Sequence, residues 1–299
     1  MKMLNVDSQR AIEFTYGRKH INSRITKAIE EDSYLMSKVE QGCELLKEWL
    51  ESNFYESKNK RLEPLQLMDH ESVVTTVFNI VAYCQTPELF TSIVGMLAAT
   101  FNLEEKIENI KTAAEILAVL CNTDAYDILK NNTGNLVIQC KFGLPQALIE
   151  SIERSHYLPP MIFKPNRLKD NFTSPYLTLD KDCLILGRGN AHTGDLCLDV
   201  LNIQNSVELK LDYEFIQSLE EAPPSEPDTD QILNWKTFLK QSKEVYDLIH
   251  FHGDEFFMPY KVDKRGRIYS LGYHINPQGY AYKKAMIELA NPEFIEVPL

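Results

Sequence analysis

The spacing of apolar residues changes near residue 156, and this change limits the folds that the chain can adopt. Upstream, apolar residues recur at helical spacing, first over residues 22–54 and then in further segments. Downstream, Pro159, Pro160 and Pro165 favour extended backbone, because the proline ring fixes φ and removes an amide donor. The sequence therefore predicts a mainly α fold with a smaller α+β part.

The order of the expected elements follows from the same periodicities. Residues 22–54 predict one long or two shorter amphipathic helices, residues 55–64 a polar connection, and Asp69 the opening of another helical stretch. Residues 86–88, Thr-Pro-Glu, form a favourable helix start, since threonine caps free amides and proline suits the first turn. Beyond them we expect helices to about residue 130, a break at 131–135, a strand at 136–138 and a helix at 145–155. Paired strands should follow at 176–179 and 183–186, joined by 180–182, and then a helix-compatible segment at 196–211. The last expected elements are an acidic linker at 220–230, an amphipathic helix at 231–250 and extended backbone at 256–269.

Composition narrows the class of protein. With 299 residues, of which 44% are hydrophobic and 25% charged, the chain can bury one large core or two smaller ones. The longest apolar stretch, Leu89–Phe101, contains three hydroxyl residues and is shorter than the roughly 18 residues of a membrane span, so we interpret it as a buried helix. The first residues lack the apolar core of a signal peptide, which favours a cytoplasmic location. The six cysteines are widely spaced without a C-x-x-C pair, which favours reduced thiols over disulfides or zinc.

The charge of the chain is unevenly distributed. The net charge of −12 argues against a protein that coats nucleic acid through bulk electrostatics. Between Lys261 and Lys284, six basic residues accompany one acid, a net charge of +5, while the other residues carry 25 basic and 42 acidic side chains, a net charge of −17. A smaller basic patch, Lys58, Lys60 and Arg61, lies in the otherwise acidic first half and is a second place that could reach a phosphate backbone.

The segment at 256–270 combines an apolar strand with a cluster of charges. It reads Phe-Phe-Met-Pro-Tyr-Lys-Val-Asp-Lys-Arg-Gly-Arg-Ile-Tyr-Ser, and Asn-Pro-Gln-Gly follows at 276–279. Arg267 can make forked contacts with phosphate oxygens, while Asp263 can hold a neighbouring arginine or the turn in position. Gly266 allows close approach of the backbone. The alternative is a charged hairpin turn on the surface, in which Asp-x-x-Gly serves only the turn.

This stretch closely resembles the D-x-x-G-R region of the single-subunit RNA polymerases of phages and mitochondria. In that family an aromatic-x-Pro-Tyr/Phe sequence precedes D-x-x-G-R-x-Tyr, and Asn-Pro-Gln-Gly follows. The same order stands here at residues 257–260, 263–269 and 276–279. The next segment, Lys283–Ala290, is similar to the helix that succeeds the motif in the family.

Weaker similarity lies upstream of the motif. Residues 157–165 resemble the proline-rich start of a strand pair, residues 199–206 an Asn- and Gln-bearing helix near the template, and residues 234–236 the thumb helix. The resemblance therefore covers about residues 145–299. Residues 1–144 match only in being helical.

The resemblance divides the expected fold into four regions. Residues 1–144 form a helical amino-terminal domain, and residues 145–220 hold strand pairs and a helix that resemble the template side of the family. Residues 221–252 hold the linker and a short thumb-like helix, and residues 253–299 hold the D-x-x-G-R segment and the start of a polymerase palm.

The resemblance also implies a reaction and partners. In the family two aspartates far downstream of the D-x-x-G-R region hold Mg²⁺ ions in a two-metal mechanism. This chain stops 32 residues after Arg267, so we expect no catalytic residue and no metal ligand in it. A second subunit should carry the palm aspartates and the fingers. The expected enzyme is a heterodimeric phage DNA-directed RNA polymerase, inactive without that partner, which binds template DNA and nascent RNA in the bacterial host cytoplasm.

We also expect helper proteins. Self-sufficient members of the family carry a long hairpin that opens the promoter, and residues 135–155 leave little room for one. The resemblance therefore implies dependence on helper proteins or on DNA that is already melted.

The residues expected to contact nucleic acid lie within the motif. Arg267 and Arg265 are assigned to phosphate groups of the template or the hybrid. Asp263 is assigned to organising the arginines rather than to a metal, because one carboxylate cannot supply a magnesium site. The full set is Lys261, Asp263, Arg265, Gly266, Arg267, Tyr269, Asn276 and Gln278.

Two pairs of residues in or next to this set have alternative roles. Asn276 and Gln278 either face the DNA or satisfy the backbone of a turn. Tyr260 and Tyr269 either stack on nucleotides or belong to the core, which is the commoner place for aromatic residues in strands.

Two other functions compete with the polymerase subunit. A truncated polymerase could serve as a stand-alone nucleic-acid-binding or regulatory protein. An unrelated metabolic enzyme is the third possibility, although no nucleophile or cofactor loop is recognisable. A partner-bound subunit should leave apolar surface exposed at Ile287, Leu289 and residues 294–299, whereas a free binding protein should cover it.

Overall fold

The computed structural model describes residues 4–101, 106–155, 157–179, 183–187, 190–219 and 229–292. The structure is 55% helix and 11% strand, and its strands form small antiparallel sheets. This confirms the prediction of a mainly α fold with a smaller β part. None of the helices described is long and apolar enough to cross a membrane.

The chain divides into two compact units. The helical unit comprises residues 21–153, and the terminal unit comprises residues 1–20 together with residues 154–299. The first helix of the chain therefore belongs with its carboxyl-terminal half, a pairing that no local sequence pattern indicates. The four functional regions expected from the sequence remain predictions.

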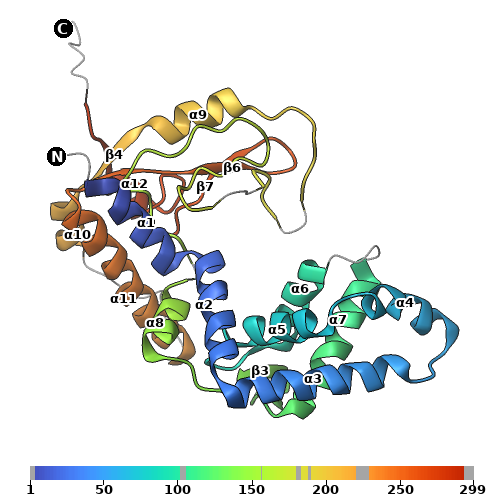
Figure 1. The fold of residues 1–299 in the computed structure, drawn as a ribbon. Helices are drawn as coiled ribbons and strands as arrows, with labels where there is room; N and C mark the ends of the chain where they lie inside the picture. The colour runs from blue at the N-terminus through green and yellow to red at the C-terminus, as the bar shows by residue number, and fades with distance from the viewer. Residues whose placement is uncertain are drawn as a thin grey trace, which may run out of the picture. The chain divides into compact units, whose positions relative to one another are not determined.

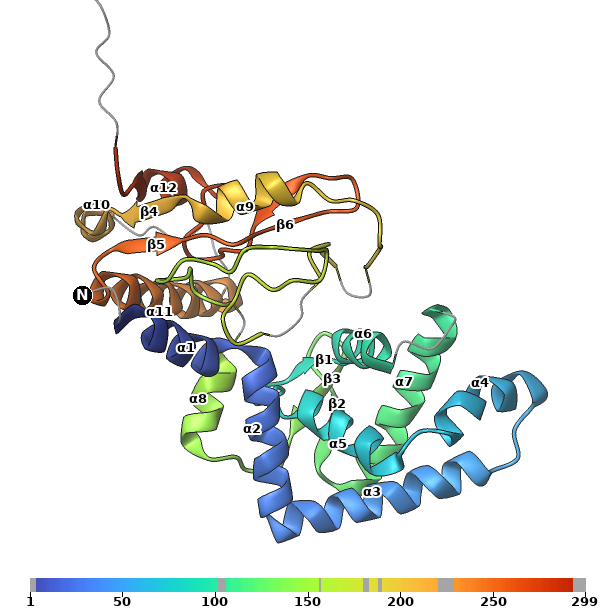
Figure 2. The same cartoon turned by 45° about the horizontal axis from the view of Figure 1, so that its top comes forward.

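The helical unit packs its helices around one apolar core that includes Leu46, Phe78 and Leu97 (Figures 1 and 2). α3 contacts α5 and α7, and α6 contacts α7. The three strands pair antiparallel in the order β1-β3-β2. The elements are α2 (Arg18–Glu31), α3 (Ser33–Glu51), α4 (Glu56–Gln66), α5 (His70–Val81), β1 (Glu88–Leu89), α6 (Phe90–Phe101), α7 (Lys106–Leu120), the 3-10 turn η1 (Cys121–Thr123), β2 (Tyr126–Lys130), β3 (Leu136–Cys140) and α8 (Gln146–Arg154).

Residues 22–54 form two helices rather than one. α2 ends at Glu31, and the carboxylate of Asp32 caps α3 by accepting hydrogen bonds from the amides of Tyr34 and Leu35 at 2.9 and 3.1 Å. A capping carboxylate satisfies amides that the first turn of a helix leaves free. The shorter pair of helices is therefore the arrangement adopted.

The polar connection expected at residues 55–64 is wrong, because most of this segment belongs to α4. Leu62 and Leu65 are buried. Two guanidinium contacts of 3.0 Å tie Arg61 to the carboxylate of Glu115 in α7. Tertiary packing thus stabilises a helix whose local sequence, with a proline in its last turn, favours a loop.

Two segments expected to be helical are strands instead. Residues 88–89 form β1, so α6 begins only at Phe90, and residues 126–130 form β2. Both pair antiparallel with β3, the strand expected at residues 136–138. The other helices expected in this unit, those opening near Asp69 and spanning 89–101 and 145–155, are confirmed as α5, α6 and α8.

The terminal unit combines helices with two small sheets (Figures 1 and 2). In both views α11 runs along the sheet of order β5-β4-β8, and α1 lies beside α11. Ile12, Leu211, Ile249 and Phe256 belong to the shared core. The elements are α1 (Leu4–Tyr16), α9 (Leu198–Ser206), β4 (Glu208–Leu211), α10 (Tyr213–Ser218), α11 (Thr229–Phe251), β5 (Glu255–Phe257), β6 (Tyr260–Val262), β7 (Ile268–Ser270), α12 (Ala281–Ala285) and β8 (Ile287–Leu289).

Residues 176–179 and 183–186 are not the paired strands that the sequence predicted. The second segment bonds to β6, where Val262 both donates to and accepts from the peptide groups that flank Ile185, at 2.9 and 2.7 Å. The first segment forms hydrogen bonds with the side chain of Glu13 in α1 instead.

Glu13 of α1 holds this first segment in an irregular conformation. Its carboxylate accepts hydrogen bonds from the amides of Leu177 and Thr178 at 2.9 and 2.7 Å. Gln9, also buried, donates to Glu13 and accepts from the amide of Ile162. A side-chain network therefore replaces the strand ladder that the sequence suggested.

Two other stretches contain a helix and then a strand. Residues 196–211, expected to suit one helix, form α9 and β4, and Lys283–Ala290, expected to be helical, holds the end of α12 and β8. β4 and β8 pair with each other, so the second part of each stretch forms hydrogen bonds of the sheet instead of those of a helix. The helix expected at 231–250 is confirmed as α11, and the extended segment at 256–269 as β5, β6 and β7 with the turn between the last two.

Several expected features fall outside the described residues. They are the connection at 180–182, residues 220–228 of the linker expected at 220–230, and the apolar end at 294–299.

Candidate nucleic-acid interface

The candidate site is a hairpin formed by β6 and β7. Lys261 pairs with Tyr269 across the hairpin. The turn is closed by hydrogen bonds from the amide of Asp263 to the carbonyl of Arg267, 2.9 Å, and from the amide of Gly266 to the carbonyl of Asp263, 3.0 Å. Gly266 has φ +80, a conformation that residues with a Cβ rarely adopt. The glycine of the motif is therefore explained by the turn itself.

Asp263 organises the turn. Its carboxylate accepts from the amides of Arg265 and Arg267 at 2.8 and 3.0 Å, and from Nε and Nη2 of Arg265 at 2.9 and 2.8 Å. Desolvation by burial acts to raise the pKa of Asp263, but the hydrogen bonds from Arg267 and Arg265 outweigh it and lower the pKa to about 2. The carboxylate is therefore ionised at neutral pH and fixed between two arginines.

The two arginines differ in how much of the guanidinium stays free. Arg265 uses two of its nitrogens on Asp263. Arg267 approaches Asp263 only through Nε, at 3.9 Å, and its side chain is 58% exposed. Most of the Arg267 fork is therefore directed to solvent, where it can bind an anion.

The two strands of the hairpin present one face to the core and one to the arginines. Tyr260 and Val262 are buried, and burial raises the pKa of Tyr260. Lys261 and Tyr269 lie on the other face and are half-buried, and the Tyr269 hydroxyl is 3.5 Å from Asp263. Of the two tyrosines, Tyr260 is therefore a core residue, and Tyr269 accompanies the charged turn.

Asn276 and Gln278 use their amide groups to support β7. Gln278 accepts from the amide of Ser270 at 2.8 Å and donates to the carbonyl of Ile268 at 2.9 Å. Asn276 accepts from the Ser270 hydroxyl and from the Gln278 amide, and donates to the carbonyl of Gly272. This geometry supports the backbone role among the two alternatives, and a contact of either residue with nucleic acid remains a prediction.

The hairpin is anchored at its base by a distant helix. The amide of Tyr260 donates to Oδ1 of Asn205 in α9 at 2.9 Å, and α9 packs along β6. The peptide groups on either side of Ile185 also bond to β6, so two segments remote in sequence hold this strand. The charged turn therefore projects from a fixed support.

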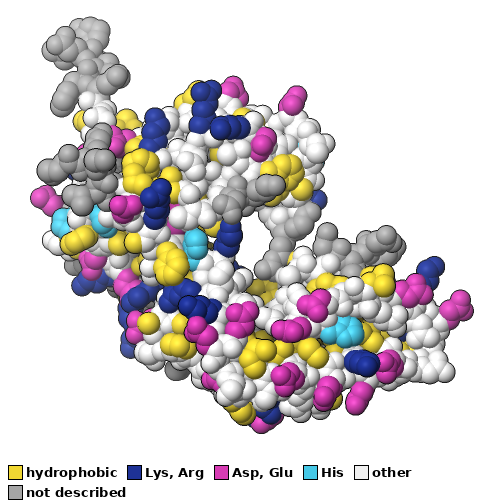
Figure 3. All heavy atoms as spheres, in the orientation of Figure 1, with side chains coloured by type: hydrophobic (Ala, Val, Ile, Leu, Met, Phe, Trp, Pro, Cys, Tyr) yellow, Lys and Arg dark blue, Asp and Glu magenta, His cyan; other side chains and the backbone are white. Residues whose placement is uncertain are grey.

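Two of the three residues of the second basic patch, Lys58 and Arg61, form ion pairs. Arg61, with a side chain only 5% exposed, contacts Glu108 and Glu115, and Lys58 contacts Glu115 and lies over the ring of Phe54. Acidic side chains predominate over α3, α4 and α5 on the face of the helical unit that Figure 3 shows. Neither Lys58 nor Arg61 is thus free to reach a phosphate backbone.

Sequence reasoning missed two basic residues, Lys164 and Arg167, that line a groove beside α9. Single cations in an irregular segment follow no motif, so no sequence signal identified them. Comparison with known proteins places none of these features in a family, because no protein-family model matches the chain and no curated protein matches it in sequence.

Proposed function

We propose that these 299 residues form a non-catalytic subunit of a DNA-directed RNA polymerase that serves phage transcription. The observation that carries the proposal is the Asp263 turn, which holds two arginine amides and leaves most of the Arg267 guanidinium exposed. It occurs within the one segment, 256–279, that resembles the D-x-x-G-R region of single-subunit RNA polymerases.

In this proposal the hairpin binds the phosphate backbone of the template or of the RNA–DNA hybrid. Arg267 makes the principal contact and Arg265 adds a second charge, since phosphate contacts fix the position of a strand without reading its sequence. Lys261 and Tyr269 extend the same face. Gly266 permits the turn.

The chemistry of nucleotide addition is assigned to a partner subunit. That subunit carries the aspartates that hold Mg²⁺, together with the fingers, and the pair acts with template DNA, nascent RNA and helper proteins in the host cytoplasm. Of the two described residues expected to be exposed toward a partner, Leu289 on β8, an edge strand of its sheet, is 55% exposed, whereas Ile287 packs against the core of the terminal unit.

The test is capture of the partner followed by RNA synthesis. The tagged chain is isolated from its native cells, and primed RNA synthesis with Mg²⁺ is measured on single-stranded DNA. Arg267→Ala should lower synthesis by about 10- to 100-fold without releasing the partner, because a charge-assisted phosphate contact is lost. Lys264→Ala is the matched control, since it removes one exposed charge from the same turn.

The results separate the polymerase subunit from a stand-alone binding protein. Synthesis that requires both chains and is impaired by Arg267→Ala but not by Lys264→Ala supports the proposal. A chain that elutes alone and binds nucleic acid without synthesis would contradict it.

A further inference from the structure

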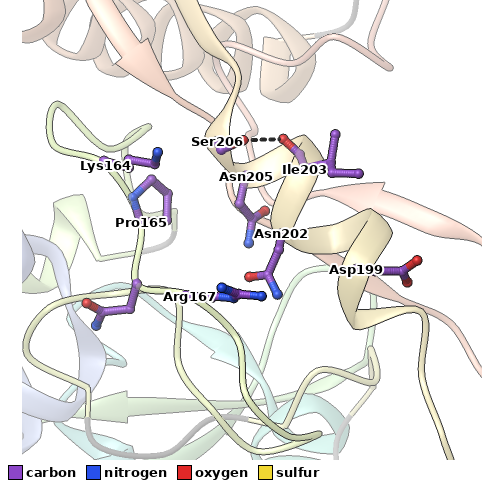
Figure 4. Close-up of a pocket in the computed structure, with 9 residues that line it drawn as sticks. Lys164, Pro165, Arg167, Asp199, Asn202, Ile203, Asn205 and Ser206 are labelled. Atoms are coloured by element: carbon purple, nitrogen blue, oxygen red, sulfur yellow. Dashed lines mark hydrogen bonds between the residues drawn. The ribbon is translucent and has the colours of Figure 1, made fainter.

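A groove of about 460 Å³ lies between α9 and the irregular segment that precedes it (Figure 4). Segment 164–167 forms one wall and the polar face of α9 forms the other. The lining residues are Lys164, Pro165, Asn166, Arg167, Asp199, Asn202, Ile203, Asn205 and Ser206.

The groove contains a buried hydrogen-bond donor without a partner. Asn205 is 3% exposed, and its Oδ1 accepts the amide of Tyr260. This bond fixes the orientation of the side-chain amide, because a backbone N–H must face the oxygen. Nδ2 then has no hydrogen-bond partner among the described residues. Figure 4 shows it directed toward Asn202 and Arg167. Such a donor is costly unless a ligand accepts from it.

Two cations extend toward the same wall of α9. Lys164 and Arg167 are exposed, and neither forms an ion pair with another described residue. In Figure 4 both side chains extend from their segment toward the helix. Asp199 is the one acid in the lining, and its carboxylate points away from them. The groove is therefore positive where the unpaired amide lies.

The other polar groups of the lining are already used. Asn202 accepts from the amide of Leu168 at 2.7 Å and donates to its carbonyl at 3.0 Å. The Ser206 hydroxyl donates to the carbonyl of Ile203 at 2.8 Å. Asn166 donates to the carbonyl of Tyr176 at 2.7 Å. Apart from Oδ1 of Asn166 and the carboxylate of Asp199, the side-chain groups left to bind a ligand are donors, and two of them are charged. They require an anion with several acceptor oxygens.

We propose that this groove binds a phosphate group through Lys164, Arg167 and Nδ2 of Asn205. A phosphate offers three or more acceptor oxygens to donors that converge from two walls, and a guanidinium matches two of them at once. Pro165 leaves an apolar surface next to the charges, beside which the sugar or base attached to the phosphate can lie. The phosphate belongs to a nucleic-acid strand or to a free nucleotide, and only the first source rests on the proposed function.

The test observes Asn205 directly. The side-chain NH₂ signals of Asn205 are identified by NMR through their loss in Asn205→Asp, which keeps the acceptor for Tyr260. The full chain is then titrated with inorganic phosphate and, separately, with single-stranded oligothymidylate. We expect a saturable shift of the Asn205 signals. Arg167→Ala and Lys164→Ala should each weaken binding about fivefold or more, and for the strand should reduce the salt dependence by about 0.7 per cation removed.

Lys169→Ala is the matched control, because Lys169 is exposed in the same segment but does not line the groove. The Lys169→Ala variant should bind both probes with the affinity of the unmodified chain. A shift with the oligonucleotide alone assigns the groove to a phosphodiester strand, and a shift with inorganic phosphate as well assigns it to free phosphate groups.

The inference is overturned if neither probe shifts the Asn205 signals. Equal weakening by Lys169→Ala and Arg167→Ala would also overturn it, because diffuse charge would then explain the binding. These failures leave partner capture and the Arg267→Ala effect untouched. If the chain captures no partner but the Asn205 signals shift, the proposed function is contradicted while the phosphate-binding groove is supported.

Discussion

The carboxylate of Glu13 accepts hydrogen bonds from both the amide and the hydroxyl of Thr178, at 2.7 and 2.6 Å, although 165 residues separate the two. Glu13 is 1% exposed, and its other oxygen accepts from Gln9 and Leu177. Both oxygens therefore face donors. This contact ties the first helix of the chain to an irregular segment of the terminal unit.

Replacing Glu13 by Gln should destabilise the protein by about 3 kcal/mol, because an NH₂ group would face donors at one of the two positions. Urea unfolding measures the change. The control Glu31→Gln removes an exposed carboxylate that contacts Lys27 at 3.6 Å, and should change stability by less than about 0.5 kcal/mol. Equal effects of the two substitutions would show that the buried network contributes nothing.

Gly266→Ala should weaken the hairpin through backbone strain alone. No atom lies within 4 Å of a Cβ placed at Gly266, but its φ is +80, and a left-handed conformation costs a residue with a Cβ about 1–2 kcal/mol. Gly95→Ala is the matched control: it also has open space, it lies in α6, and alanine should stabilise that helix by up to about 1 kcal/mol. Thermal unfolding should therefore shift in opposite directions, and a shift of the same sign would contradict the assignment.

Asp263 should titrate far below an ordinary aspartate. Its pKa of about 2 is lower than the unfolded value of about 3.9, so its stabilising contribution is complete above pH 4 and is lost as pH falls toward 2. The ¹³C shift of its carboxyl carbon should therefore have a midpoint near 2. A midpoint near 3.9 would mean that the bonds from Arg265 and Arg267 do not persist in solution.

His274 should make stability fall in mild acid. Desolvation by burial, with the charge of Lys283 as a second cause, lowers its pKa to about 4, and its Nδ1 lies 2.8 Å from the Ser242 hydroxyl. Between pH 6.5 and 4, His274 is protonated in the unfolded chain but not in the folded chain, so stability decreases as pH decreases. From pH 7 to pH 5 this amounts to roughly 2 kcal/mol.

The variant His274→Gln should lose that part of the pH dependence, as measured by urea unfolding at the two pH values. Its own stability at pH 7 is compared separately, since the substitution also alters packing. An unchanged difference between pH 7 and pH 5 would assign the pH dependence to other groups.

Local periodicity predicted the elements that bury one continuous stripe. α6 and α11 lie where the sequence placed them, because apolar side chains at helical spacing need only one neighbouring surface. The segments that were predicted wrongly depend on distant partners instead. Residues 126–130 become a strand because β3 is beside them, and α4 depends on the acids of α7.

The candidate site divides in the same way. The turn from Asp263 to Arg267 was predictable, since aspartate and glycine at this spacing encode a turn whose carboxylate accepts nearby amides. The groove beside α9 was not, because its cations and Asn205 are separated by about forty residues of irregular chain and meet only in the folded unit. No pattern in the sequence indicates that these residues lie close together.

The support that Gln278 gives to β7 also protects the hairpin from self-association. A two-stranded hairpin leaves amides and carbonyls exposed along its outer edges, where a strand of another molecule can add. By accepting from Ser270 and donating to Ile268, the Gln278 side chain occupies two of these groups on β7. A short, charged hairpin can thus stand out from the unit without becoming a template for aggregation.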